Sequence, residues 1–329
     1  MSGFFTAYGL FLAELVTLAV LLVGVVAFIL ALRRGGRSEG LAVQHLNRSF
    51  EDAADELKLA IDGKGRQKKE AKARAKQRKR EDKARDKHEQ AKPRTFVLDF
   101  KGDLRASAVA SLREEVSAVL QVAKPGDEVL LKLENPGGTV HEHGLAASQL
   151  LRLKQHGVPL TVAVDKVAAS GGYLMACVAD RIIAAPFAVI GSIGVLAQLP
   201  NFHRLLEEKG IDYEQVTAGR YKRTLTVFGK NTEEGREKLR QEVEDVHELF
   251  KAQIHEYRPQ VDLERVATGE HWHGIRALEL KLVDELRTSD DVLLEAAKQR
   301  DLYHLAYRRR RGWSERVMGG VDSVLERFG

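Results

Sequence analysis

The chain has 329 residues, 44% of them hydrophobic, which is enough for a membrane anchor and one domain of about 200 residues with a substantial core. The single cysteine, Cys177, excludes an intrachain disulfide and a cysteine-rich metal site. The net charge of +5 is uneven, because residues 64–92 carry 14 Lys and Arg against 5 Asp and Glu, which leaves the rest of the chain at −4. We therefore expect no nucleic-acid partner, since such a partner requires a basic face on the folded body.

An apolar run lies close to the N-terminus. Leu15–Leu32 contains no charged residue, and Glu14 alone interrupts the longer run Leu10–Leu32. At 1.5 Å per residue this run crosses a hydrocarbon core of about 30 Å. A cleaved signal peptide is the alternative, but no positive segment precedes the run and no small-residue cleavage site follows it. We expect residues 1–35 to form a single-pass transmembrane anchor that contacts membrane lipid.

The anchor is followed by a charged segment. Residues 36–93 include the basic run 64–92, which is rich in Ala, Lys, Arg, Glu and Gln and has no apolar face to bury. We expect a partly helical, solvated spacer, and contact with anionic lipid headgroups is the alternative interpretation. Arginines after the anchor, with no Lys or Arg before it, favour a cytoplasmic body by the positive-inside rule.

Beyond Pro93 the pattern changes to that of an α/β domain, which we place at residues 94–300, with a basic tail over residues 301–329. Apolar runs of strand length alternate with apolar residues at helical spacing, which indicates parallel sheets with crossover helices. The predicted strands are Thr95–Phe100, Val129–Leu133, Pro159–Val164, Arg181–Ala184 and Val189–Ile190, and the predicted helices are Ser107–Val122, a segment around Leu145–Leu153, Asn201–Lys209 and Thr232–Tyr257.

Two glycine-rich turns each follow a predicted strand and open a predicted helix, at the edge where open α/β sheets bind ligands. Glu134–Thr139 (ENPGGT) could expose backbone N–H groups to a developing oxyanion, or could be only a tight turn. Val167–Tyr173 (VAASGGY) isolates the hydroxyl of Ser170 among small residues. An N-cap is the alternative role of Ser170, but the flanking glycines also suit a nucleophile on a strand-to-helix turn.

A serine nucleophile needs a general base. His141, His143 and His156 lie nearest in the sequence, but none has an obvious orienting carboxylate, and we expect surface positions for them. Gly219–Lys222 (GRYK) offers a lysine instead. A lysine accepts a proton near neutral pH only when burial removes water from its ammonium group, so Lys222 would have to be desolvated. A solvated basic cluster with the neighbouring arginines is the alternative.

The order and spacing of Asn135–Gly138 (NPGG), Ala169–Tyr173 (ASGGY) and Gly219–Lys222 (GRYK) resemble the signal peptide peptidase A family of Ser/Lys peptidases. The run Tyr221–Arg236 and the segment from Thr268 to Asp284 add to the resemblance, which covers most of residues 1–300.

This resemblance implies an α/β fold of the Clp-protease/crotonase-like class, with Ser170 as nucleophile and Lys222 as general base. It also implies that Gly138 and Gly171, with Gly137 as neighbour, supply the oxyanion donors. We expect no cofactor and no metal, and we interpret His271 and His273 as structural residues.

Further expectations from the resemblance concern partners and location. We expect peptide or protein substrates, with signal-peptide-like or misfolded envelope polypeptides favoured, and we expect a homo-oligomer. We also expect the protein to lie in the cell inner membrane, with its catalytic domain in the periplasm. Two other functions stay open. A crotonase-like acyl-CoA enzyme would need no serine nucleophile, and a non-catalytic membrane scaffold would tolerate Ser170→Ala.

Overall fold

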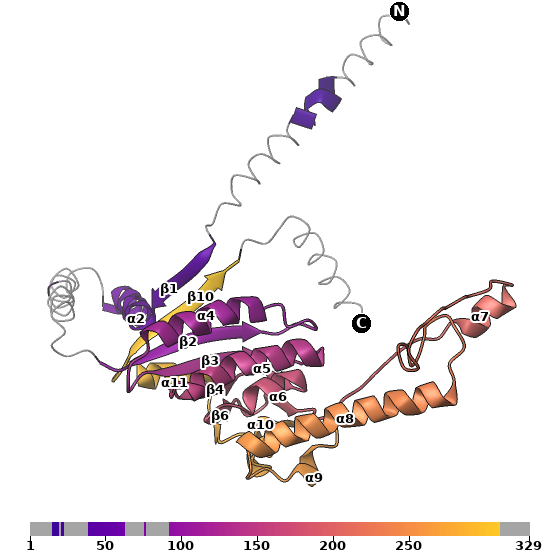
Figure 1. Cartoon of the computed structure of the whole chain (residues 1–329). Coiled ribbons are helices and arrows are strands. Elements are labelled where there is room, and N and C mark those ends of the chain that lie inside the picture. The colour runs from indigo at the N-terminus through magenta and orange to yellow at the C-terminus, as the bar shows by residue number, and fades with distance from the viewer. Residues whose placement is uncertain (1–14, 20, 23–38, 63–75, 77–91, 310–329) are drawn as a thin grey trace, which may run out of the picture. The chain divides into compact units, whose positions relative to one another are not determined.

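The computed structural model describes residues 15–19, 21–22, 39–62, 76 and 92–309 (Figure 1). The predicted anchor and the basic run 64–92 fall largely outside these residues, as does the end of the predicted tail. Among the residues described, no helix is both long and apolar enough to cross a membrane. Residues 41–307 form one compact unit, which contains every element discussed below except the outermost residues of β1 and β10.

A seven-stranded sheet organises this unit, in the order β1-β10-β2-β3-β4-β6-β9. Its strands are β1 Gly40–His45, β2 Arg94–Lys101, β3 Glu128–Glu134, β4 Leu160–Val164, β6 Arg181–Ala184, β9 Glu285–Leu286 and β10 Asp301–Arg308. From β10 to β9, each neighbouring pair is parallel. The predicted α/β fold with a parallel sheet is therefore confirmed.

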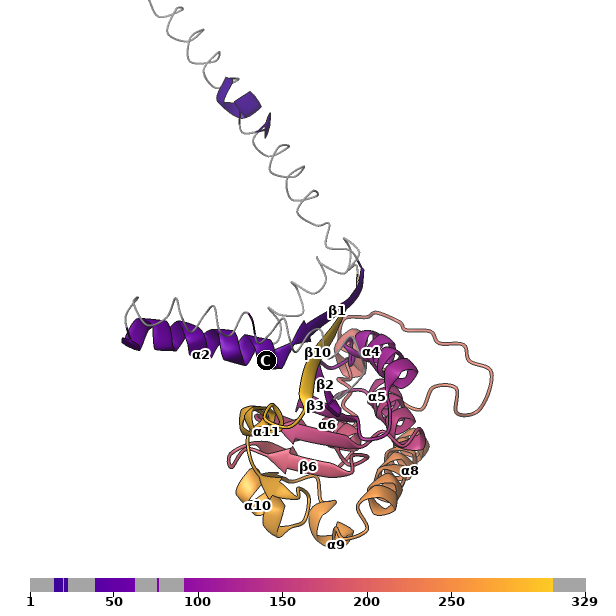
Figure 2. The ribbon, with the colours of Figure 1, turned by 90° about the vertical axis from the view of Figure 1, so that its left-hand side faces the viewer.

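Apolar layers cover both faces of the sheet, as a parallel sheet requires. Leu98 and Leu131 belong to the main core, whereas their chain neighbours Val97 and Leu130 belong to a smaller cluster on the opposite face. The main core includes α4 Val109–Val122, α5 Val140–Gln155 and α6 Gly171–Ala176, and the smaller one includes residues of α2 Leu46–Asp62 and α11 Ser289–Ala296. Figure 2 shows α11 on one side of the strands and α4 and α5 on the other.

The sheet extends beyond the expected domain limits of 94 and 300. β1 and α2 come from the expected spacer and β10 from the expected basic tail, so both segments contribute structure to the domain. Asn47 at the start of α2 connects them, since its side chain accepts a hydrogen bond from Leu302 N (2.7 Å) and donates to the carbonyl of Ala297 (3.0 Å). In β10, Leu302 packs in the smaller apolar cluster and Leu305 in the main core, so this strand contributes to both faces of the sheet.

A second, smaller sheet carries the candidate site. It consists of β5 Val167–Ala169, β7 Val189–Gly191 and β8 His271–His273, with β5 parallel to β7 and β8 antiparallel to β7. After β7 the chain leaves the body for residues 194–232, which include α7 His203–Glu208, and returns along α8 Glu233–Tyr257. We call residues 194–232 the arm. Figure 1 shows α8 running from the region of α6 out to α7.

Candidate active site

The two glycine turns lie against each other. Asn135, just after β3, forms a parallel bridge with Ala168 of β5. Gly137 has a φ of 99°, and a Cβ added to it would lie 2.8 Å from Ser170 Cβ and 2.9 Å from Gly171 N. Only glycine fits this conformation at this distance. The pairing of the two turns therefore depends on the glycine at position 137.

Ser170 has an unusual backbone conformation for a residue with a side chain. Its φ of 51° and ψ of −120° lie in a region that costs on the order of 1–3 kcal/mol. The turn is held by a hydrogen bond from Ser170 N to the carbonyl of Gly191 (2.8 Å) and by one from Leu174 N to the carbonyl of Ser170 (2.9 Å). The Ser170 side chain makes no capping hydrogen bond to α6, so an N-cap role does not account for this serine.

The three glycines expected at the oxyanion site differ in their hydrogen bonds. Gly137 N donates to Asn135 Oδ1 (2.9 Å), so this donor is already used within the protein. Gly138 N and Gly171 N have no acceptor among the described residues. Gly171 is the first residue of α6, where backbone N–H groups lack a partner within the helix. Gly138 and Gly171 therefore offer two free donors near Ser170.

Lys222 lies in the arm and is exposed, so the single chain does not supply the desolvation that a lysine base needs. The neighbouring Arg220 pairs with Glu234 near the start of α8 (2.6 Å). At the other end of this helix, Gln253 Nε2 donates to the carbonyl of Leu174 in α6 (3.2 Å). From Glu234 to Gln253 the helix rises by roughly 28 Å. Within one chain, Lys222 and Ser170 are therefore not brought together.

The histidines nearest Ser170 in the sequence have different positions. His141 and His156 are exposed, as expected. The expectation of a surface position is wrong for His143, which is fully buried. His143 lies one helical turn before Ala147 and two turns before Leu150, both in the core, so its spacing placed it on the buried face of α5. Sequence reasoning did not predict that His143 and its partner Asn135 are both buried.

Cys177 is not an alternative nucleophile. Its side chain is buried, and its Sγ donates to the carbonyl of Leu174 (3.3 Å). Burial raises the pKa of this thiol to about 12, so the thiolate needed for attack is not formed near neutral pH.

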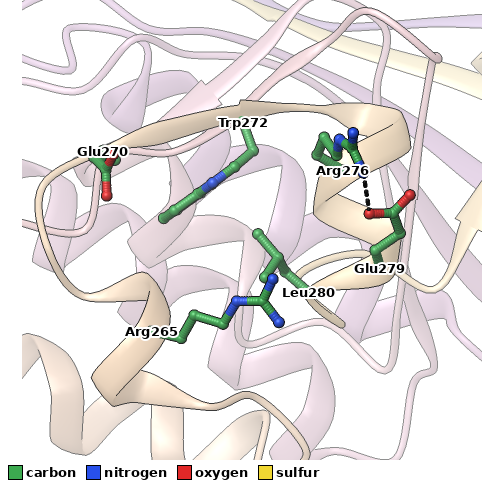
Figure 3. A pocket seen from close by; sticks show the side chains of 6 residues that line it. All are labelled: Arg265, Glu270, Trp272, Arg276, Glu279 and Leu280. Atoms are coloured by element: carbon green, nitrogen blue, oxygen red, sulfur yellow. Dashed lines mark hydrogen bonds and ion pairs between the residues drawn. The ribbon is translucent and has the colours of Figure 1, made fainter.

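A pocket lies behind the small sheet rather than at Ser170, and Figure 3 shows its lining of Arg265, Glu270, Trp272, Arg276, Glu279 and Leu280. Arg276 is paired with Glu279 (2.7 Å). The Trp272 ring packs on Gly191, where an added Cβ would lie 2.9 Å from Cε3. Since the Gly191 carbonyl accepts the Ser170 N–H, this indole supports the Ser170 turn from behind.

His271 and His273, on either side of Trp272, are exposed. Within the described residues, no group of three or more His, Cys, Asp or Glu is arranged to hold a metal ion.

Comparison with known proteins shows which family the chain belongs to. Residues 3–150 match the peptidase family S49 N-terminal model, and residues 152–303 match the peptidase family S49 model. The chain is 49% identical over 318 residues to "Probable protease SohB" of Haemophilus influenzae, covering 94% of this chain and 90% of that protein. It is 56% identical over 234 residues to "Probable protease SohB" of Buchnera aphidicola subsp. Acyrthosiphon pisum, covering 71% and 70%.

Among solved structures, a mutant of the 1510-N membrane-bound stomatin-specific protease with a substrate peptide aligns at 14% identity and a TM-score of 0.45, covering 70% of this chain and 99% of that one. The sequence comparisons confirm the resemblance described above and support a peptidase. The chain belongs to peptidase family S49.

Proposed function

We propose that this protease is a serine endopeptidase in which Ser170 is the nucleophile and Lys222 the general base. The observation that carries the proposal is the strained turn at Ser170, whose hydroxyl caps no helix and whose neighbours Gly138 and Gly171 offer free N–H groups. Strain of this kind is found where surrounding structure holds a residue for function. An acyl-CoA enzyme that relies on backbone donors alone has no need of this serine.

The proposed reaction proceeds through an acyl-enzyme. Ser170 Oγ attacks the scissile carbonyl carbon while its proton passes to the neutral Nζ of Lys222. The carbonyl oxygen becomes negatively charged and accepts hydrogen bonds from Gly138 N and Gly171 N. Collapse breaks the C–N bond, and the Lys222 ammonium protonates the departing amine. A water molecule, deprotonated by Lys222, then attacks the ester, and its collapse returns the proton to Ser170 Oγ.

Lys222 would reach Ser170 from another copy of the chain. The observations in favour are its exposure and the length of α8, which carries it away from the serine of its own chain. Exposed apolar residues are numerous in the arm, among them Leu196 at 71% and Val216 at 98%. Covering these residues with a neighbouring body would also desolvate Lys222, as its role requires. The proposal therefore includes a homo-oligomer that is needed for activity.

Mixing two inactive variants tests this arrangement. Ser170→Ala and Lys222→Ala homo-oligomers should each be inactive, because the two groups act as a unit. After the two variants are dissociated, mixed and reassembled together, the mixture should regain up to about a quarter of wild-type activity. The active sites are those in which an intact Ser170 of one chain meets an intact Lys222 of its neighbour. Lys230→Ala, on the same arm, is the matched control and should remain active. A mixture without activity, alongside active wild type, would contradict a shared site.

Covalent labelling tests the nucleophile separately. A fluorophosphonate should label wild type and fail to label Ser170→Ala. Ser192→Ala is a close control, because Ser192 also has a positive φ (50°) and follows Gly191, which binds the Ser170 N–H. This variant should still be labelled. Labelling of Ser170→Ala at the wild-type rate would show that Ser170 is not the nucleophile. Lys222→Arg should be inactive, since a guanidinium does not release its proton.

We also propose that residues 1–35 anchor the protein in the inner membrane, on the strength of the uncharged run Leu15–Leu32. The substrates would be signal-peptide-like or misfolded envelope polypeptides, on the strength of the family resemblance. A periplasmic catalytic domain predicts that alkaline phosphatase fused after residue 300 is active and that a green fluorescent fusion is dark. The reverse pattern would place the domain in the cytoplasm, as the arginines after the anchor favour.

A further inference from the structure

Two fully buried polar side chains lie behind the glycine turns and have no part in the proposed reaction. Asn135 and His143 are both 0% exposed. The ring Nε2 of His143 lies 3.2 Å from Asn135 Oδ1, and its Nδ1 lies 2.9 Å from the carbonyl of Thr139. Polar groups at such depth are costly unless they are hydrogen-bonded, so this pair requires an explanation.

Asn135 determines which N–H of the turn stays free. Its Oδ1 accepts the Gly137 N–H (2.9 Å), and its Nδ2 faces Met175 Sδ (3.2 Å). Its backbone is also fixed, since Asn135 N donates to Val167 O (2.8 Å) and Asn135 O accepts from Ala169 N (3.0 Å). The Gly137 donor is thus held inside the protein, and Gly138 N–H is left as the donor that the turn can offer to a substrate.

His143 touches the parts of both turns that carry the donors. A Cβ added to Gly171 would lie 2.5 Å from His143 Cγ, so the ring packs directly against this glycine. Through Thr139 and Asn135 the same ring contacts both ends of the segment that contains Gly138. Both of its neighbours are oxygen atoms, and a neutral ring has one N–H, so the tautomer decides which of the two oxygens accepts the hydrogen bond.

The geometry points to His143 and Asn135 as positioning residues that hold Gly138 N–H and Gly171 N–H at a fixed separation for the oxyanion. This inference rests on the proposed function and deepens it. Two adjacent glycines have wide conformational freedom, and donors stabilise a transition state only when they are oriented before the charge develops. The Asn135–His143 pair supplies that orientation from behind the site, without contacting the substrate.

The kinetic test uses His143→Phe, which keeps a ring but has no N–H, and Asn135→Leu, which has no acceptor. Each should lower kcat on a peptide substrate by roughly 10- to 100-fold, with KM changed by less than about threefold, because oxyanion contacts form in the transition state. His143→Gln and Asn135→Asp keep a donor and an acceptor and should recover most of the loss. Gln149→Leu, a change of a buried polar residue on the same helix, should have wild-type kinetics.

A second measurement does not depend on activity. The Gly137 amide should exchange slowly with deuterium in wild type and in Gln149→Leu, and faster in His143→Phe and Asn135→Leu, at unchanged global stability. If His143→Phe or Asn135→Leu does not fold, His143→Gln, Asn135→Asp and the deuterium exchange rate of the Gly137 amide in wild type still test the inference. Rapid exchange of Gly137 in wild type, or wild-type kcat in His143→Phe, would overturn the positioning role. If the Gly137 amide is protected from exchange but the enzyme remains active without Ser170, only the proposed function is overturned.

Discussion

The body around the seven-stranded sheet and the arm of residues 194–232 differ in what covers their apolar side chains. In the body, Leu98 and Leu131 are wholly buried between the sheet and the helices. In the arm no residue is buried, and Leu196, Ile211 and Val216 are mostly exposed. The arm is nevertheless ordered locally, since Asn201 Nδ2 donates to the carbonyls of Thr226 (2.8 Å) and Gly229 (3.0 Å). The body therefore builds its core within one chain, whereas the arm buries none of its apolar side chains.

Truncating an apolar side chain in each region gives the largest expected contrast. Leu131→Ala should lower the free energy of unfolding by about 2–5 kcal/mol, because it leaves a cavity at the centre of the sheet. Leu196→Ala in the arm should leave the unfolding midpoint of the isolated chain unchanged. Urea unfolding followed by circular dichroism measures both. Equal losses in the two variants would show that the arm is part of the cooperative body.

Charged pairs should show the same contrast at a similar magnitude. Arg258 is buried, and its guanidinium donates two hydrogen bonds to Asp284 (2.9 and 2.6 Å), whose Oδ2 also accepts from Ile182 N (2.7 Å). Arg258→Met should cost about 3–5 kcal/mol of unfolding free energy, because it removes one partner of a largely buried pair. Arg220→Met, which removes an exposed pair with Glu234, should not shift the thermal midpoint measurably.

The body should also have a pH dependence that comes from one buried carboxyl. Glu115 on α4 is buried and accepts the N–H of Tyr307 (2.7 Å). Burial raises the pKa of this carboxyl to about 7, with the charge of Asp99 adding to the effect and His304 opposing it. The folded state then binds more protons than the unfolded state between about pH 4.5 and 7, so stability falls as pH rises through this window.

Replacing Glu115 by Gln should remove this pH dependence, since an amide has no proton to lose. The variant should be more stable than wild type by up to about 3 kcal/mol at pH 8 and little different at pH 4. Urea unfolding at several pH values tests this, with Glu242→Gln, a partly exposed glutamate of α8, as control. A gain of stability in Glu115→Gln that is the same at pH 4 and pH 8 would exclude the linkage.

The smallest effect on folding, with a separate effect on assembly, is expected at Val216 in the arm. Val216 is 98% exposed, so Val216→Asp should leave the unfolding midpoint unchanged. If another copy covers the arm, the same change should weaken the oligomer, because it places a charge in an apolar contact. Analytical ultracentrifugation with Glu214→Asp as control measures this. Unaltered assembly would remove the arm from the interface.

Strands β2, β3, β4, β6 and β7, the helices α4, α5, α7 and α8 and the two glycine turns could be predicted from the sequence because their signals are local. The apolar run Val129–Leu133 became β3 with one further residue at each end, and the predicted helix Thr232–Tyr257 begins one residue later, with Thr232 as its N-cap. Thr232 Oγ1 accepts from Gly235 N (3.1 Å), a bond between residues three apart that the sequence itself brings together.

Tertiary structure alone decided which distant segments meet. β10 joins the sheet beside β2 although about 200 residues separate them along the chain, and neither the charge nor the hydropathy of residues 301–308 specifies that partner. Helical spacing places His143 on the buried face of α5, but its contact with Asn135 depends on how α5 packs against α6, which no local pattern contains. The distance between Ser170 and Lys222 could not be predicted from the sequence either. The motifs make both residues candidates, but the length and packing of α8 keep them apart within one chain.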